Sequence, residues 1–190
     1  MSRGRQSSIS REAWSLAALK AMRTGGVRAV RVEPIARKLG VTKGSFYWHF
    51  TDRDELVRAA LDLWEERGTT RVIDKASRVA DPVERVVSLF EMAFSQRGGG
   101  VLLVHLAGDA EHPLVAPLLE RITRRRLEFI AAQFAALGLN ADEAYRRALL
   151  CYSAYAGTFT LDASVPGSVP DGAERHAYLD HLVRTLVPGD

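Results

Sequence analysis

The chain has 190 residues, of which 47% are hydrophobic and 26% charged, an ordinary composition that excludes a wholly disordered polypeptide. Its single cysteine, Cys151, excludes an internal disulfide, and no apolar run approaches the roughly 20 residues needed to cross a bilayer. The N-terminus is polar and lacks the apolar segment of a signal peptide. We therefore expect a soluble, cytoplasmic protein without disulfides.

The formal net charge of +3 conceals a strong asymmetry along the chain. Residues 1–50 contain ten Lys or Arg and two acidic residues, a net charge of +8. Residues 51–190 contain sixteen Lys or Arg and twenty-one acidic residues, a net charge of −5. A basic N-terminal segment followed by an acidic remainder is typical of a polyanion-binding domain attached to a domain that does not bind polyanions, although a basic segment can equally be a solubilising surface.

The first three predicted helices are short and lie within the basic segment. The first begins after Ser10, a good N-cap, and ends at the Gly-Gly pair 25–26. The second spans about 33–39 and is followed by a tight turn at a glycine. The third begins at Thr42, whose hydroxyl can cap it, and runs to about His49.

The longer predicted helices follow. One begins after Asp52, with Glu55 in the position of a capping box, and its end is left open between Gly68 and residue 75. The next begins at Asp81-Pro82, and a break is expected at the glycine run 98–100. The short apolar run 101–106 stays unassigned, and three further helices are predicted at about 113–137, 141–164 and 173–186. The total is about nine helices, an all-α fold.

The third helix divides its residues between two tasks. Phe46 and Phe50 lie four residues apart, so they share a face and can anchor the helix to a small core. Tyr47 and Trp48 then project elsewhere, and exposed donors and flat rings suit contacts with phosphates and base edges. Gly44, a poor helix former, suggests a close approach to the backbone. Two short helices joined by a turn in a basic segment meet the requirements of a helix-turn-helix.

Residues 10–65, and most clearly Ile35 to Phe50, closely resemble the DNA-binding domain of the TetR family of bacterial transcriptional regulators. Arg53-Asp54-Glu55-Leu56 matches the start of the family's fourth helix. The resemblance implies that the third helix enters the major groove. The DNA-binding residues expected from it are Arg31, Thr42, Lys43, Gly44, Ser45, Tyr47, Trp48, His49 and Arg53. Arg31 is a departure, because the family usually has Thr or Ser there; Arg31 could contact a phosphate but could not cap the second helix.

The resemblance also implies a domain plan and a mechanism. Residues 1–51 would form the DNA-binding domain, the fourth helix at 52–67 a connector, and residues 68–190 a ligand-sensing and dimerising domain. The last two long helices would pair with a second copy, and the dimer would bind a pseudo-palindromic operator in double-stranded DNA. By analogy with the family, the protein would act as a repressor, and a small-molecule effector would release it from that operator.

Several alternatives stay open. The candidate effector contacts are Phe90, Phe94, His105, Phe129, Tyr152, Tyr155 and Phe159, but aromatic residues at helical spacing are more often plain core. The sensing domain could serve only for dimerisation, without any small-molecule input. An enzyme is rejected, because no catalytic motif is present and no cofactor is expected. The residue types of His105, Asp109, Glu111 and His112 could bind a metal, but a His-Asp pair near a helix end is common, so no metal site is predicted.

Overall fold

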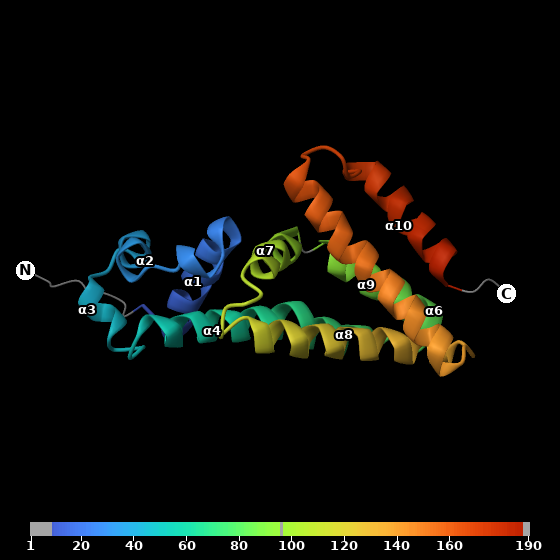
Figure 1. Cartoon of the computed structure of the whole chain (residues 1–190), viewed down its shortest axis with the longest axis horizontal. Coiled ribbons are helices and arrows are strands. Elements are labelled where there is room, and N and C mark those ends of the chain that lie inside the picture. The colour runs from blue at the N-terminus through green and yellow to red at the C-terminus, as the bar shows by residue number, and fades with distance from the viewer. Residues whose placement is uncertain (1–8, 96, 188–190) are drawn as a thin grey trace, which may run out of the picture. The chain divides into compact units, whose positions relative to one another are not determined.

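A computed structural model of the chain describes residues 9–95 and 97–187, and these residues are helical with no strand among them. The chain divides into two compact units at the Trp64–Glu65 boundary. Ten α-helical stretches are present in the described residues, and the π-helical turn η2 follows α4 and leads into α5 without a break along the chain, so that nine helices can be counted among these residues, as predicted (Figure 1). The all-α expectation is confirmed.

The N-terminal unit contains the first four α-helices. Their bounds are α1 Arg11–Gly25, the 3-10 turn η1 Val27–Ala29, α2 Val32–Leu39, α3 Lys43–Phe46 and α4 Arg53–Glu65. The rings of Trp14 and Phe46 meet edge to face with centroids 5.5 Å apart, and both are fully buried. Aromatic pairs of this kind add to the free energy gained by burying their area, so the small core fixes α3 against α1.

The local signals for helix starts and stops operate as predicted at α1 and α2. Ser10 Oγ accepts a hydrogen bond from the backbone N–H of Ala13 at 3.1 Å. Gly40 has φ 70°, the left-handed conformation that ends α2, and its N–H bonds to the last carbonyls of that helix. Such a conformation costs a side-chain-bearing residue energy, which explains the glycine.

The third helix is shorter than predicted. It spans only Lys43–Phe46, and tighter turns continue the chain to Phe50. Thr42 occupies the N-cap position, but its side chain makes no capping hydrogen bond, so the prediction that its hydroxyl caps α3 is wrong. The backbone carbonyl of Thr42 accepts from Ser45 N–H at 3.1 Å instead.

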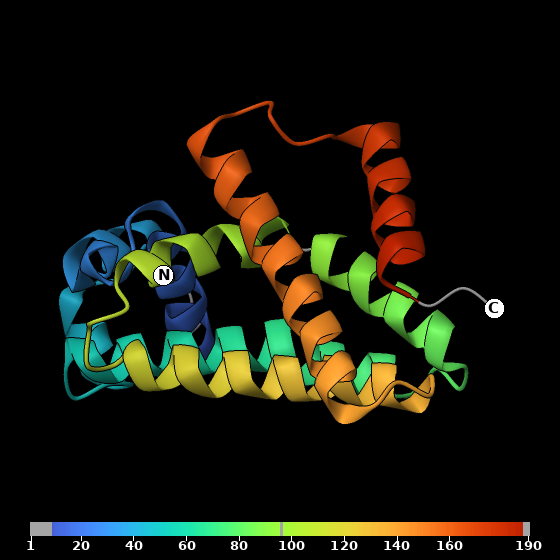
Figure 2. The same ribbon diagram turned by 45° about the vertical axis from the view of Figure 1, so that its right-hand side comes forward.

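The C-terminal unit contains the π-turn and six α-helices. Their bounds are the π-turn η2 Glu66–Thr70, α5 Arg71–Ala76, α6 Pro82–Ser95, α7 Arg97–Gly108, α8 Ala116–Ala136, α9 Ala141–Ser164 and α10 Gly172–Leu186. Asp81 caps α6 through a 2.8 Å bond from Glu84 N–H, and Asn140 caps α9 through a 3.0 Å bond from Glu143 N–H. A loop joins the distal ends of α9 and α10, which run in opposite directions (Figure 2).

The glycine run 98–100 does not break the chain as predicted; it lies within α7. A Cβ built on Gly100 would lie 2.2 Å from Cγ of Phe159, a separation that real Cβ atoms do not show. Glycine therefore permits a close approach of α7 to α9, and the burial of Leu102 and Leu106 stabilises the helix against the intrinsic cost of about 1 kcal/mol per glycine.

One buried cluster of the C-terminal unit combines aromatic and aliphatic side chains. It comprises Val86, Phe90, Phe94, Leu127, Ile130, Phe134, Ala144, Ala148, Cys151, Phe159, Leu179, Leu186 and Val187. Cys151 is buried and burial raises the pKa of its thiol to about 12, which makes it an unreactive part of this core. Within the described residues, no helix combines the length and the apolar character required to span a membrane.

Candidate nucleic-acid interface and effector core

The segment Thr42–Phe50, here called the recognition turn, presents two aromatic rings to solvent. Tyr47 is 61% exposed and Trp48 86% exposed, whereas Phe46 and Phe50 are buried and stack on each other with centroids 5.5 Å apart. The division of these four residues between core and surface follows the prediction. Backbone bonds from His49 N–H and Phe50 N–H to Phe46 O, of 2.9 and 3.0 Å, set the curve of the turn.

The start of the recognition turn lies against α2. Lys43 Nζ and Glu33 Oε1 are 2.6 Å apart on the surface. The hydrogen bond between them is the main reason that the pKa of Glu33 is lowered and that of Lys43 raised. Both side chains are more than half exposed, so the pair can exchange partners at small cost, and Lys43 stays available to a phosphate.

The other predicted DNA contacts in and before the turn differ in exposure. Thr42 and Gly44 are exposed, whereas Ser45 and His49 are half-buried. A Cβ on Gly44 would meet only Thr42 Oγ1 at an ordinary 3.6 Å, so no neighbour within the chain requires glycine there. Arg31 occupies the N-cap position of α2, makes no side-chain capping bond and is exposed, as the departure from the family pattern predicts.

Arg53 has a structural task in this chain. Its Nε donates to the carbonyl of Val30 at 2.7 Å, and Nη2 donates to the carbonyl of Val27 at 2.6 Å. It thereby holds η1 and the entry to α2 against the start of α4. The third nitrogen of its guanidinium, Nη1, lies 3.1 Å from Asp54 Oδ1, and the Arg53 side chain is partly exposed. Contact of Arg53 with a DNA phosphate stays a prediction.

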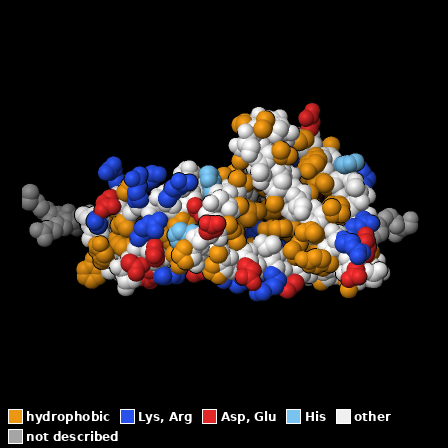
Figure 3. All heavy atoms as spheres, in the orientation of Figure 1, with side chains coloured by type: hydrophobic (Ala, Val, Ile, Leu, Met, Phe, Trp, Pro, Cys, Tyr) orange, Lys and Arg blue, Asp and Glu red, His pale blue; other side chains and the backbone are white. Residues whose placement is uncertain are grey.

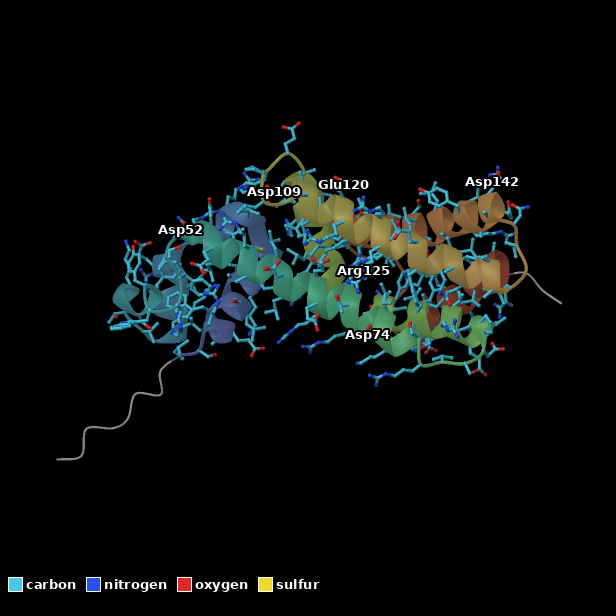
Figure 4. All side chains as sticks on the ribbon, turned by 90° about the horizontal axis from the view of Figure 1, so that it is seen from below. Asp52, Asp74, Asp109, Glu120, Arg125 and Asp142 are labelled. Carbon is cyan, nitrogen blue, oxygen red and sulfur yellow. The ribbon has the colours of Figure 1, made fainter. Side chains whose placement is uncertain are left out.

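Arg11, to which the sequence analysis gave no role, meets Glu55 at the other end of the recognition turn. Arg11 of α1 donates to the carbonyl of His49, pairs with Glu55 Oε1 at 2.8 Å, and lies over the Phe50 ring at 4.3 Å. The partners are 38 and 44 residues distant from Arg11 along the chain, so no local pattern could have revealed them. Figure 4 labels Asp52, which caps α4 beside this junction.

Lys and Arg side chains gather on one side of the N-terminal unit, over α1 and α2 (Figure 3). This clustering agrees with the net charge of +8 in residues 1–50. A concentrated positive surface attracts the phosphates of DNA, and the recognition turn belongs to the same unit.

Five of the seven predicted effector residues come together in the C-terminal unit. Phe94 contacts the rings of Phe90, Tyr155 and Phe159, with centroids 6.1, 5.7 and 5.9 Å away, and Tyr152 stacks on Tyr155 at 6.1 Å. Tyr178 of α10, which the sequence analysis did not assign, joins them 6.5 Å from Phe94. His105 and Phe129 are half-buried and lie outside this cluster.

Arg126 of α8 connects the aromatic cluster with the π-turn. Its guanidinium lies 5.8 Å from the centre of the Tyr155 ring, Nε donates to Thr69 Oγ1 at 3.0 Å, and Nη2 donates to Gly68 O at 3.0 Å. Burial raises the pKa of the Tyr155 hydroxyl and the Arg126 charge opposes that rise. Its neighbour Arg125, labelled in Figure 4, donates to Thr70 Oγ1 of the π-turn at 2.9 Å.

The part of the chain that the structure describes contains no group of three His, Cys, Asp or Glu residues that could hold a metal ion. His112 instead accepts a 3.2 Å bond from Leu114 N–H through Nδ1, in the turn that precedes α8. His105 and His112 therefore contribute to no such group.

The family model described as bacterial regulatory proteins, tetR family, matches residues 16–60. The chain is 40% identical over 68 residues to the HTH-type transcriptional regulator TtgR of Pseudomonas putida, which covers 36% of this chain and 31% of that protein. It is 36% identical over 69 residues to the HTH-type transcriptional repressor KstR2 of Mycobacterium tuberculosis, with 36% and 34% covered. The chain thus spans about a third of the length of these relatives.

Two solved structures extend the likeness in fold across almost the whole chain. A transcriptional regulator from Rhodococcus sp. Rha1 superposes with a TM-score of 0.76 at 20% identity, covering 93% of this chain and 95% of that one. A regulator from Saccharomonospora viridis in complex with choline superposes with a TM-score of 0.71 at 20% identity, covering 93% and 92%. All four proteins are named as regulators and none as an enzyme. The N-terminal unit is therefore similar to bacterial regulatory proteins of the tetR family over residues 16–60, and most of the chain shares the fold of the two solved regulators.

Proposed function

We propose that the protein is a dimeric repressor of transcription that binds a pseudo-palindromic operator through the recognition turn and is released by a small-molecule effector. The observation with most weight is the exposure of Tyr47 and Trp48 beside the buried Phe46 and Phe50. Large rings held in solvent by a rigid core gain nothing for folding and suit contacts with base edges and sugar–phosphate. Repression is proposed because the relative KstR2 is named a repressor.

The DNA contacts proposed within this function follow from exposure and charge. Tyr47, Trp48 and His49 would contact the major groove, with Thr42, Lys43, Gly44 and Ser45 at the start of the turn. Arg31 and Arg53 would contact flanking phosphates. Lys43 would exchange Glu33 for a phosphate, a trade that the high exposure of the ion pair permits.

Dimerisation is proposed through α9 and α10. Tyr145, Leu149, Leu150 and Leu161 of α9 are between 46% and 56% exposed, an unusual concentration of large apolar residues on one helix surface. Ser153, Gly157 and Thr160 lie between them along the same surface and would let a second helix approach closely. A second copy of the chain would cover this surface and place two recognition turns about 34 Å apart, one DNA turn.

Effector sensing is proposed for the aromatic cluster around Phe94, with Tyr152, Tyr155, Phe159 and Phe90. Support comes from the choline complex of the structurally similar Saccharomonospora viridis protein, since it places a small molecule on this fold. Arg126 would transmit the signal, because it contacts Tyr155 and also bonds to Gly68 and Thr69 in the π-turn that directly follows α4 along the chain. π-turns often mark functional positions in helices.

The DNA-binding half of this function is tested by recovering fragments of sheared genomic DNA on the purified protein at fixed, moderate salt and sequencing them. We expect enrichment of a few sites with two-fold symmetry for the wild type and none for the Tyr47→Ala, Trp48→Ala double variant. Recovery of the same unpatterned background by both proteins would contradict it, because charge alone would then explain the binding.

The sensing half is tested by a thermal-shift screen of small molecules. A true effector stabilises the folded state by mass action and also lowers affinity for the recovered operator. A screen in which stabilising compounds leave operator affinity unchanged would favour the alternative of a dimeric DNA-binding protein without small-molecule input.

A further inference from the structure

We propose that Arg11 is a positioning residue for DNA recognition: its guanidinium joins the carbonyl of His49 to the carboxylate of Glu55 and so fixes the orientation of the exposed rings of the recognition turn. The proposal rests on the function proposed above and adds a residue outside the turn to its machinery. Arg11 lies on α1, far along the sequence from every predicted DNA contact, and need not touch DNA at all.

The recognition turn needs such support because little of it is regular helix. α3 has four residues, too few for a continuous ladder of helical hydrogen bonds. At its start, the Lys43–Glu33 pair is exposed and weak. The rings of Phe46 and Phe50 anchor two points, but the peptide that joins Tyr47, Trp48 and His49 lies outside the core. A hydrogen bond to the His49 carbonyl therefore fixes the position of the end of this segment.

Arg11 makes this bond in a way that no other side chain type could. One nitrogen, Nη1, donates to His49 O, a second, Nη2, donates to Glu55 Oε1 at 2.8 Å, and the planar group stacks on Phe50 at 4.3 Å. A guanidinium presents its donors in a fixed fork, whereas a lysine ammonium is a point charge without a plane. The three contacts together define both the position and the tilt of the group.

The carboxylate of Glu55 is itself held in place by Thr51, through the oxygen that does not face Arg11. Its Oε2 accepts from the backbone N–H of Thr51 at 2.7 Å and from Thr51 Oγ1 at 2.9 Å. Its own N–H donates to Asp52 Oδ1 at 2.7 Å, which anchors it in the first turn of α4. The chain of bonds therefore runs from α4 through Glu55 and Arg11 to the end of the recognition turn.

A direct phosphate contact by Arg11 is the rival explanation, since half of its side chain is exposed. The two explanations differ at Glu55. Removing a carboxylate near DNA strengthens phosphate attraction, so Glu55→Gln would tighten binding if only charge mattered. If Glu55 positions the turn through Arg11, the same change loosens binding to the operator selectively.

The test uses full-length protein, the operator duplex recovered from genomic DNA, and a shuffled duplex of equal length. The variants are Arg11→Gln, Arg11→Lys and Glu55→Gln, with Lys20→Gln as a control that removes one exposed charge from the same helix. We expect the ratio of operator to shuffled affinity to fall about tenfold in the three variants, as the loss of a charge-assisted hydrogen bond implies. Lys20→Gln should keep the wild-type ratio.

Two outcomes of this experiment would overturn the proposal. One is a wild-type affinity ratio in Arg11→Lys, because charge would then suffice. The other is tighter operator binding by Glu55→Gln. A phosphate contact would also lower the slope of log affinity against log salt by about 1 in Arg11→Gln, whereas positioning leaves that slope unchanged.

A second measurement separates this proposal from the proposed function. Amide hydrogen exchange of the DNA-free protein reports the backbone bonds donated by Tyr47, His49 and Phe50. We expect faster exchange of these amides in Arg11→Gln and Glu55→Gln, with the amides of α9 unchanged as a check on folding. Unchanged exchange in both variants would overturn positioning even if operator binding is found. If the wild type selects no operator, the proposed function fails while the exchange result still decides the role of Arg11.

Discussion

Two nearby residues of the recognition turn, Phe46 and Trp48, differ sharply in burial. Phe46 is buried among α1 and α3 and meets Trp14 and Phe50, whereas Trp48, two positions later, is almost wholly in solvent. The first residue stabilises the fold and the second is free to serve binding. Substitutions at these two positions should therefore separate stability from DNA affinity.

Trp48→Ala should change the free energy of unfolding by no more than about 0.5 kcal/mol, as for other exposed sites, while operator affinity falls at least tenfold, on the order of one base contact. Phe46→Ala is the matched comparison and should cost about 3–5 kcal/mol of stability through the cavity it leaves. Urea denaturation and fluorescence anisotropy with a labelled duplex measure the two quantities. A Trp48→Ala protein that is strongly destabilised would show that the ring packs inside the molecule.

Gly100 makes a second prediction at this scale. The Cβ of Gly100→Ala would meet the Phe159 ring at 2.2 to 2.3 Å, so we expect a loss of about 1–3 kcal/mol from overpacking. Gly108→Ala in the same helix has open space around its Cβ and should leave stability unchanged or slightly raised. Thermal unfolding of the two variants under one buffer compares them. Equal stability of both would contradict the close approach of α7 to α9.

At the scale of helices, local capping residues determine where a helix begins, whereas packing between helices depends on residues far apart in the sequence. The side chains of Ser10 and Asp52 cap their helices as the sequence analysis predicts, and those of Asp81 and Asn140 do the same, because each cap requires only neighbours within three residues. Glu55 departs in one detail from the predicted capping box: it reaches the N–H of Thr51 rather than that of Asp52.

What the sequence could not reveal depends on contacts distant along the chain. The glycine run 98–100 resembles a break until Phe159 is known to lie beside Gly100. Arg11 and Arg126 bond to residues at least 38 positions away, so no spacing rule points to them. Of the candidate sites, the recognition turn was located by its motif. Helical spacing located the aromatic cluster but also included His105 and Phe129, which the structure places outside it.

The junction of α4 with the recognition turn gives a pH prediction. Bonds from Thr51, followed by the bond from Arg11, lower the pKa of Glu55 from 4.5 to about 2. A carboxyl with a lowered pKa stabilises the folded state above its unfolded pKa and loses that contribution as pH falls toward its folded pKa. The difference in free energy of unfolding between wild type and Glu55→Gln should therefore be constant above pH 4.5 and shrink between pH 4.5 and about pH 2. Urea midpoints across this range measure it, and a difference that already changes near neutral pH would contradict the assignment.

The outer surface of α9 gives the prediction for assembly. Leu149→Glu places a charge within the exposed apolar surface and should convert a dimer into a monomer, because a buried unpaired charge is costly. Val83→Glu on α6, also exposed, should leave the dimer intact. Sedimentation velocity distinguishes the two masses. A wild type that is already monomeric, or a Leu149→Glu variant that stays dimeric, would contradict an interface on α9.

At the scale of the whole molecule, the chain combines a basic N-terminal unit, in which residues 16–60 match the tetR family model, with a C-terminal unit that contains a buried aromatic cluster. Arg126 links the core of the second unit to the π-turn, which continues directly from α4. In the proposed function, an effector that moved Tyr155 or Arg126 would therefore act on the backbone that directly follows α4 along the chain.

The most direct test of the central claim is the affinity of the wild-type protein for its recovered duplex compared with a shuffled duplex of the same length, measured by fluorescence anisotropy at one fixed salt concentration. Specific regulators typically bind their sites at least about a thousandfold more tightly than unrelated DNA, and we expect a ratio of that order that collapses in Trp48→Ala. Equal affinity for the two duplexes would contradict the account, since the basic unit would then bind DNA through its charge alone.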